Sequence, residues 1–128
     1  MIQRFIELGE GYSDIYELID IAEARANRVH RLIRLDTNVD GKNVISLAVA
    51  LTPIEPGHYM PIYFCREGIP NPDEKMNQRY ELFSQLAKTL QKPITQIEVK
   101  PSTVFEEKTL YYQYLTGVLR LNHFIPSL

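Results

Sequence analysis

The sequence contains little that could build a covalent or cysteine-based framework. Its 128 residues include a single cysteine, Cys65, so the chain forms no internal disulfide bond and no zinc site made of cysteines. No apolar run approaches the ~20 residues that a membrane-spanning helix needs. The opening residues MIQRFIELGE lack the long apolar core of a signal peptide, and we therefore expect a cytoplasmic protein.

The short motifs of nucleotide and metal enzymes are absent as well. The chain contains no G-x-x-x-x-G-K-[ST], G-x-G-x-x-G, H-E-x-x-H, C-x-x-C or G-x-S-x-G sequence and no EF-hand loop. Its histidines, His30, His58 and His123, show no metal-ligand spacing. We therefore predict no catalytic residue from a motif, no metal and no cofactor.

The charge balance and composition are those of an ordinary globular domain. Lys and Arg number 14 against 16 Asp and Glu, and the net charge of −2 argues against a dedicated partner of nucleic acids or anionic membranes. Hydrophobic residues make up 45% of the chain and charged residues 23%, without repeats or linkers. We expect a single domain over residues 1–128, long enough to bury roughly two-thirds of its unfolded surface.

The hydrophobic periodicity predicts an α+β fold. Alternating apolar residues indicate strands, whereas apolar residues spaced three and four apart behind capping signals indicate helices. Their order is β-α-β-β-β-α-β-α, which predicts two layers: a mixed, mostly antiparallel sheet of about five strands with three helices packed on it. The expected strands cover 2–8, 29–36, 44–52, 58–65 and 94–100, and the expected helices cover 14–26, 71–91 and 103–119.

Four local features refine this prediction. The strand over 44–52 is apolar on both faces and is expected in the centre of the sheet. Pro61 lacks an N–H, so its strand is expected at an edge or with a bulge. Gly117 is costly inside a helix, and a close packing contact would explain it. The tail residues Phe124 and Ile125 are expected to dock onto the body of the domain.

Five potential cations occur within ten residues, namely Arg25, Arg28, His30, Arg31 and Arg34. Alternation along a strand places Arg31 and Arg34 on opposite faces of the sheet, which disfavours one continuous basic patch. We interpret this segment mainly as a solvated or salt-bridged surface. An anion-binding or RNA-binding surface made of Arg28, Arg31 and Arg34 is the alternative.

The tripeptide Cys65-Arg66-Glu67 ends a predicted strand beside an aperiodic loop. A neighbouring cation could lower the pKa of the thiol, but a thiol nucleophile also needs a base. His58 lies at the other end of the same strand and on its opposite face. A buried structural cysteine is the favoured interpretation, and a small enzyme or small-molecule-binding domain that uses this tripeptide is the alternative.

Tyr111, Tyr112 and Tyr114 cannot all face the core from one helix, so at least one is expected on the surface, where tyrosines often mark interfaces. Our leading hypothesis is a non-enzymatic domain that acts by binding a protein partner or a second copy of itself as a homodimer. The binding candidates are Arg66 and Glu67 in the 66–70 loop, together with Tyr112 and Tyr114.

Three segments carry a resemblance to a known family: MIQRFIELGEGYSD at 1–14, CREGIPNP at 65–72 and LRLNHFIP at 119–126. Over the whole chain the sequence resembles small uncharacterised proteins from Bacillus and related Firmicutes, some of which carry the label methylthioribose kinase. A sugar kinase needs a nucleotide cradle and metal-holding acids, and this sequence has no such loop, so it does not support the label. The resemblance implies a cytoplasmic bacterial protein and brings no catalytic residues.

Overall fold

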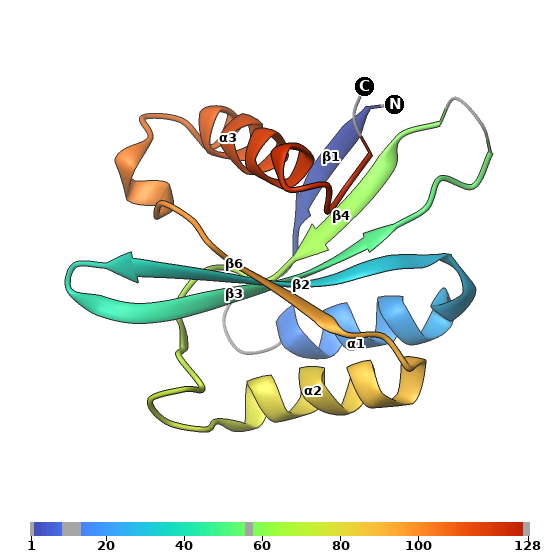
Figure 1. The fold of residues 1–128 in the computed structure, drawn as a ribbon, viewed down its shortest axis with the longest axis horizontal. Helices are drawn as coiled ribbons and strands as arrows, with labels where there is room; N and C mark the ends of the chain where they lie inside the picture. Colours follow the sequence, from blue (N-terminus) through green and yellow to red (C-terminus); the bar gives the residue numbers. More distant parts are fainter. Residues whose placement is uncertain (1, 9–13, 56–57, 127–128) are drawn as a thin grey trace.

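The computed structural model describes residues 2–8, 14–55 and 58–126, which form one sheet with helices on both of its faces (Figure 1). The regular elements alternate along the chain in the order that the periodicity predicts, with one additional short strand. They are β1 (Gln3–Glu7), α1 (Asp14–Ala24), the 3₁₀ helix η2 (Ala26–Arg28), β2 (Val29–Val39), β3 (Lys42–Leu51), β4 (Met60–Phe64), β5 (Ile69–Pro70), α2 (Gln78–Leu90), β6 (Ile94–Glu98), the 3₁₀ helix η3 (Ser102–Val104) and α3 (Lys108–Leu121).

The sheet is mixed and mostly antiparallel, which confirms the α+β class. Its strand order is β1-β4-β3-β2-β6, and β5 pairs with β3 outside this path. The β2–β3, β3–β4 and β3–β5 pairs are antiparallel, whereas β1–β4 and β2–β6 are parallel. The additional strand arises because Ile69 and Pro70 pair with Ile45 and Val44. As the apolar pattern predicts, β3 is central.

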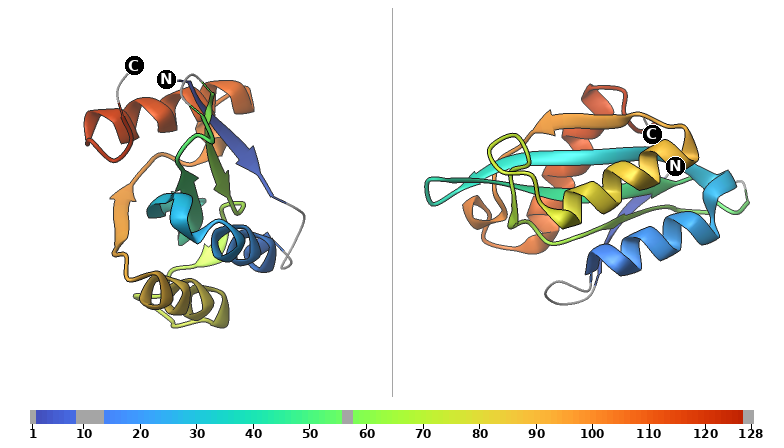
Figure 2. Two further views of the ribbon diagram at one scale, coloured as in Figure 1. Left: turned by 90° about the vertical axis from the view of Figure 1, so that its right-hand side faces the viewer. Right: turned by 90° about the horizontal axis from the view of Figure 1, so that it is seen from below.

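Helices cover both faces of the sheet, which makes one layer more than the two predicted from the sequence. α1 and α2 lie together on one face and α3 lies on the other (Figure 2). The first core includes Ile15 and Phe83; the second includes Leu115 and, as predicted, Ile125 from the tail. β6 lies at an edge of the sheet, where its alternate residues Gln96 and Glu98 are exposed.

The edge position predicted for the strand around Pro61 is wrong, because β4 lies between β1 and β3. The pairing of β4 with β3 covers residues 62–64 alone. The Met60 N–H donates to the Ile2 carbonyl at 2.8 Å, on the β1 side. Since successive backbone groups of a strand point to opposite sides, the Pro61 nitrogen points toward β3, where the ladder has already ended.

The second helix begins at Gln78 rather than at Asn71. The Asn71 carbonyl accepts the backbone N–H groups of Glu74 and Lys75 at 3.1 Å, which closes a separate turn. The true cap is Asn77, whose side chain accepts the N–H of Tyr80 at 3.0 Å. Both asparagines offer the same capping chemistry, and the sequence pattern favoured the wrong one.

The third helix begins at Lys108 rather than at Thr103, because residues 102–104 form the separate 3₁₀ turn η3. Thr103, where the helix over 103–119 was expected to begin, therefore does not start α3. The packing contact expected for Gly117 is also wrong, since a Cβ added there meets nothing within 4 Å. No helix among the described residues is long and apolar enough to cross a membrane.

Candidate functional site

A cavity of about 220 Å³ lies where β1 and β4 end and α3 begins. The two strands are parallel, and Glu7 pairs with Phe64, so both carboxyl ends reach the same edge of the sheet. We call this space the β1–β4 cavity. Three of the binding candidates predicted from the sequence line it, namely Arg66, Glu67 and Tyr112, and they are joined there by Glu7, Phe64, Ser102, Lys108 and Tyr111.

Glu7 contacts three polar side chains of the cavity. Its carboxylate lies 2.7 Å from Arg66 Nε and 3.0 Å from Lys108 Nζ, and it accepts the Tyr112 hydroxyl at 2.9 Å. Burial by itself would raise the Glu7 pKa, but hydrogen bonds from Lys108 and Tyr112 and the charges of Lys108 and Arg66 bring the pKa below 4.5. Glu7 is therefore a fixed anion at neutral pH.

Glu67, in the loop that follows β4, supplies a second carboxylate. It accepts both the hydroxyl and the backbone N–H of Ser102, the latter at 3.3 Å. Burial raises the pKa of Tyr111, and the charge of Glu67 raises it further. The pKa of Tyr112 is raised in the same way, by burial and by its hydrogen bond to Glu7. Both phenols are therefore neutral donors at physiological pH.

Aromatic rings form the apolar wall of the cavity. The rings of Phe64 and Tyr112 meet edge to face with centroids 5.5 Å apart, and those of Tyr111 and Tyr112 lie 5.8 Å apart. Phe5 stacks on Tyr112 at 5.7 Å from behind. Such contacts favour rigid ring positions, so the wall is held in place before any ligand arrives.

The cavity combines spare hydrogen-bonding capacity with exposed charge. A carboxylate has about four acceptor positions, and Glu67 uses part of this number on Ser102. The Lys108 side chain is 68% exposed although it touches Glu7. No histidine lines the cavity among the described residues. The arrangement is therefore equipped to bind both an ammonium and a carboxylate group, without an evident nucleophile and base pair.

Cys65 lies next to the cavity but does not take part in it. The residue is fully buried in the core beneath α1. Burial raises the pKa of its thiol strongly, and the nearby charge of Asp14 raises it further. His58, which the sequence places at the other end of the same strand and on its opposite face, lines a different cavity. The structural interpretation of Cys65 is consistent with this burial. Among the described residues, no group of three His, Cys, Asp or Glu side chains could hold a metal ion.

Tyr114 is not part of the β1–β4 cavity. Its hydroxyl accepts the backbone N–H of Lys100 at 2.9 Å, and its ring lies 5.1 Å from that of Phe105. Tyr111 is buried, while Tyr112 and Tyr114 are half-buried. The sequence placed at least one of these tyrosines on the surface, but all three face inward, because the segment over 99–105 covers the start of α3.

The three arginines proposed as a nucleic-acid surface do not share a face. Arg28 donates to the Thr52 carbonyl, and Arg31 donates to the Phe124 carbonyl on the α3 side of the sheet. Arg34 lies on the α2 side, with its guanidinium 5.2 Å from the Tyr80 ring. The predicted opposite orientation of Arg31 and Arg34 is confirmed, and the continuous basic face that RNA binding needs is not formed.

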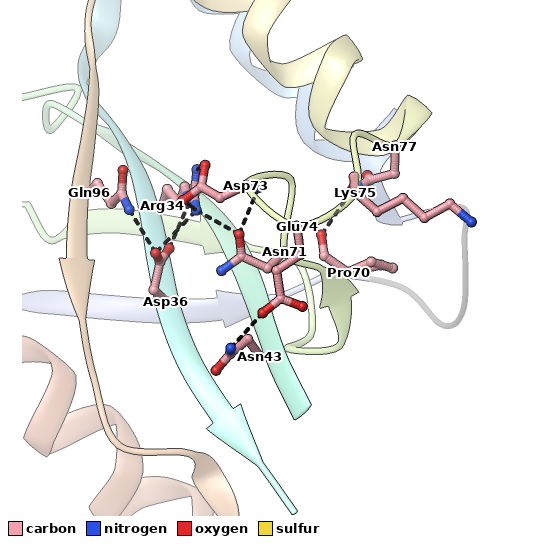
Figure 3. A network of polar contacts seen from close by, with 10 residues as sticks. All are labelled: Arg34, Asp36, Asn43, Pro70, Asn71, Asp73, Glu74, Lys75, Asn77 and Gln96. Carbon is pink, nitrogen blue, oxygen red and sulfur yellow. Dashed lines mark hydrogen bonds and ion pairs between the residues drawn. The ribbon is translucent and has the colours of Figure 1, made fainter. Parts of the chain in front are cut away.

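Arg34 holds a polar network that joins the sheet to the turn before α2 (Figure 3). Its guanidinium binds Asp36 at 2.7 Å on its own strand, Asp73 at 2.9 Å and the Asn71 side chain at 3.2 Å. Asp36 also accepts the Gln96 amide at 2.7 Å. Burial would lower the Arg34 pKa, but these hydrogen bonds raise it. Because these partners occupy its donors, we interpret Arg34 as a structural residue that holds the turn before α2 against the sheet.

Sequence reasoning missed Glu7 and Lys108, which complete the β1–β4 cavity. They are separated by 101 residues in the chain, and Glu7 is separated from Tyr112 by 105. No local pattern connects such distant residues. The available signal was weaker: the 66–70 loop carries two charged residues directly after a buried strand, and loops at strand ends are common positions for binding residues.

The chain belongs to the family described as Domain of unknown function (DUF7147), whose model matches residues 1–125. Neither the curated proteins nor the solved structures contain a significant match. The β1–β4 cavity is therefore interpreted from its own chemistry.

Proposed function

We propose that this chain binds a small zwitterionic molecule, of the size and charge pattern of a free amino acid, in the β1–β4 cavity. One observation carries the proposal: a carboxylate with spare acceptor positions, Glu67, and an exposed ammonium group, Lys108, line one cavity whose wall is aromatic. Opposite charges that line one partly apolar space match a ligand with an ammonium group at one end and a carboxylate at the other.

The size of the cavity restricts the ligand. Pockets for drug-sized ligands measure about 300–1,000 Å³. At about 220 Å³ the β1–β4 cavity is smaller than this range, so a nucleotide does not fit but an amino-acid-sized molecule does. The ligand's apolar part would lie against Phe64 and Tyr112, whose rings are already fixed by Phe5.

Each end of the ligand has an assigned partner. The ammonium group would donate to Glu67, and the Tyr111 hydroxyl is available beside it as a neutral phenol. The ligand's carboxylate would accept a hydrogen bond from Lys108, whose Nζ also forms an ion pair with the Glu7 carboxylate at 3.0 Å. Glu7 itself would remain bonded to Tyr112 and hold Lys108 in position.

Isothermal titration calorimetry with alanine, leucine and phenylalanine tests this proposal. The amines and the carboxylic acids that share the same side chains serve as one-charge controls. We expect the zwitterions to bind more tightly than either control. Glu67→Gln and Lys108→Met should each weaken binding at least about ten-fold, since a hydrogen bond to a charged group contributes about 1.5–3 kcal/mol.

Glu106→Gln and Lys88→Met are the matched controls for these two variants. Both side chains are exposed and lie outside the cavity. They remove the same charges as the test variants and should leave affinity unchanged. Equal binding of zwitterions and one-charge analogues, or an equal loss in test and control variants, would disprove the assignment.

A second candidate function, self-association through α3, is favoured by one observation. Leu110, Gly117 and Leu121 lie on one side of the helix, because seven and four residues return it to nearly the same direction. Leu110 is 45% exposed and Leu121 80% exposed, and the space above Gly117 is open. In an antiparallel pair of copies, Leu110 of each would fit above Gly117 of the other.

Light scattering of the purified protein distinguishes this candidate. We expect the mass of a dimer for the native chain and of a monomer for Leu121→Lys, which places a charge in the contact. Leu86→Met, a conservative change in the core, serves as the control for folding. A monomer at every concentration of the native chain would exclude self-association through α3.

A further inference from the structure

A second cavity, of about 120 Å³, lies at the amino end of β4, whereas the β1–β4 cavity lies at its carboxyl end. We call it the η2 cavity, because η2 and the residue before it contribute Arg25 and Arg28 to its wall. His58, before β4, adds a third potential cation. The space is bounded elsewhere by apolar and tyrosine side chains, among them Ile54 and Tyr63.

The described lining of the η2 cavity carries positive side chains and no acidic ones. No Asp or Glu lines it among the described residues. Outside the lining, the Glu55 carboxylate lies 3.7 Å from His58 Nε2, and both side chains are exposed. Two guanidinium groups facing one small space repel each other unless an anion lies between them. The electrostatics of the cavity therefore favour a negatively charged occupant.

Arg28 is held in a fixed orientation toward the cavity. Its Nε and Nη2 donate to the Thr52 carbonyl at 3.1 and 2.8 Å. A guanidinium has five N–H donors, so the Nη1 pair is left over. Arg25 is exposed, and its side chain makes no hydrogen bond or ion pair with the described residues. One arginine is thus oriented in advance, and the other can close over a bound group.

We propose that the η2 cavity binds the phosphoryl group of a small phosphorylated molecule. Its volume of about 120 Å³ accommodates one such group and not a whole metabolite. Arginine is suited to phosphate because its planar donors match the oxygens in pairs. The remainder of the molecule would lie over the rim, where Ile54 is 72% exposed and Tyr59 is 43% exposed. These side chains favour an apolar or aromatic organic part.

Inorganic phosphate and phenyl phosphate, titrated by calorimetry and followed by ³¹P NMR, test the proposal. We expect both to bind, and phenyl phosphate to bind more tightly because its ring covers the apolar rim. Arg25→Met should weaken both about ten-fold, as expected for one lost charged hydrogen bond. His58→Gln should weaken both in the same direction by a smaller factor. Both side chains are exposed, so neither change disturbs the core.

Lys88→Met, which removes an exposed cation from α2, is the matched control and should leave phosphate binding unchanged. A similar loss in Arg25→Met and Lys88→Met would show nonspecific attraction and overturn the proposal. Tighter binding of a short single-stranded RNA, with affinity falling steeply as salt rises, would overturn it in favour of a nucleic-acid surface. Glu67→Gln should not alter phosphate binding, so this test does not depend on the proposed function.

Discussion

Arg34 Nη2 lies 2.9 Å from the carboxylate of Asp73, and this ion pair joins strand β2 to the turn that precedes α2. The same guanidinium binds Asp36 through Nε at 2.7 Å. The two partners differ in exposure, because the side chain of Asp36 is 13% exposed and that of Asp73 is 69% exposed. Arg34 is almost fully buried, so its positive charge is stabilised chiefly by the buried carboxylate of Asp36.

This difference predicts unequal costs for two otherwise identical substitutions. Asp36→Asn leaves the buried charge of Arg34 with too little compensation and should lower the free energy of unfolding by about 3 kcal/mol. Asp73→Asn removes an exposed partner and should cost at most about 1 kcal/mol. Urea unfolding followed by circular dichroism measures both. Equal costs would contradict the assignment of Asp36 as the principal counter-charge.

The lowered pKa of Glu7 predicts that the folded chain loses stability in acid. Its pKa is below the ordinary 4.5 in the folded chain, so the unfolded chain takes up a proton first as the pH falls. The stabilising contribution is therefore complete above pH 4.5 and is lost as the pH falls through the lower folded pKa. Unfolding free energies measured from neutral pH to about pH 3 should fall less steeply for Glu7→Gln. An unchanged slope would contradict this role.

The lowered pKa of His30 predicts a second loss of stability on acidification, which begins at a higher pH than the loss due to Glu7. Burial and the charges of Arg31 and Lys92 lower the His30 pKa below 6.5. A hydrogen bond to the Phe124 backbone raises the pKa but does not offset these effects. The unfolded chain therefore takes up a proton below about pH 6.5 while the folded chain does not, and stability decreases as the pH falls through this window. His30→Gln should remove this decrease. The same decrease in the variant would assign it to another group.

Cys65 should be unreactive in the folded chain. It is fully buried, and burial raises its pKa, so the thiolate that attacks disulfide reagents is scarce and inaccessible. We expect Ellman's reagent at about pH 8 to label the native protein far more slowly than the protein in concentrated urea. Rapid labelling of the folded chain would contradict the structural role of Cys65 and indicate a reactive thiol.

Gly117 and Gly41 should respond in opposite directions to alanine. A Cβ meets nothing within 4 Å at either position, but Gly41 has a φ of +84° that strains an alanine. Gly117→Ala should raise the free energy of unfolding by up to about 1 kcal/mol, because alanine favours the helix. Gly41→Ala should lower it by a similar amount. Thermal unfolding at low protein concentration compares them, and a destabilised Gly117→Ala would contradict the open space above Gly117.

The local pattern of the sequence was sufficient for several features. The element order, the central position of β3 and the opposite orientations of Arg31 and Arg34 follow from alternation and helical spacing, which act over a few residues. The burial of Cys65 agrees with its place at the end of an apolar strand. The starts of α2 and α3 were misjudged because turns and helices use the same capping residues.

The sequence by itself therefore determined which segments form strands and helices and which of their faces are apolar, because these depend on side chains that are neighbours in the chain. Only the tertiary structure decided that β4 lies inside the sheet, that α3 covers its second face, and that Glu7 contacts Lys108 and Tyr112. Those contacts depend on strand order and register, which no local pattern encodes, so the candidate site appeared only when the chain was folded.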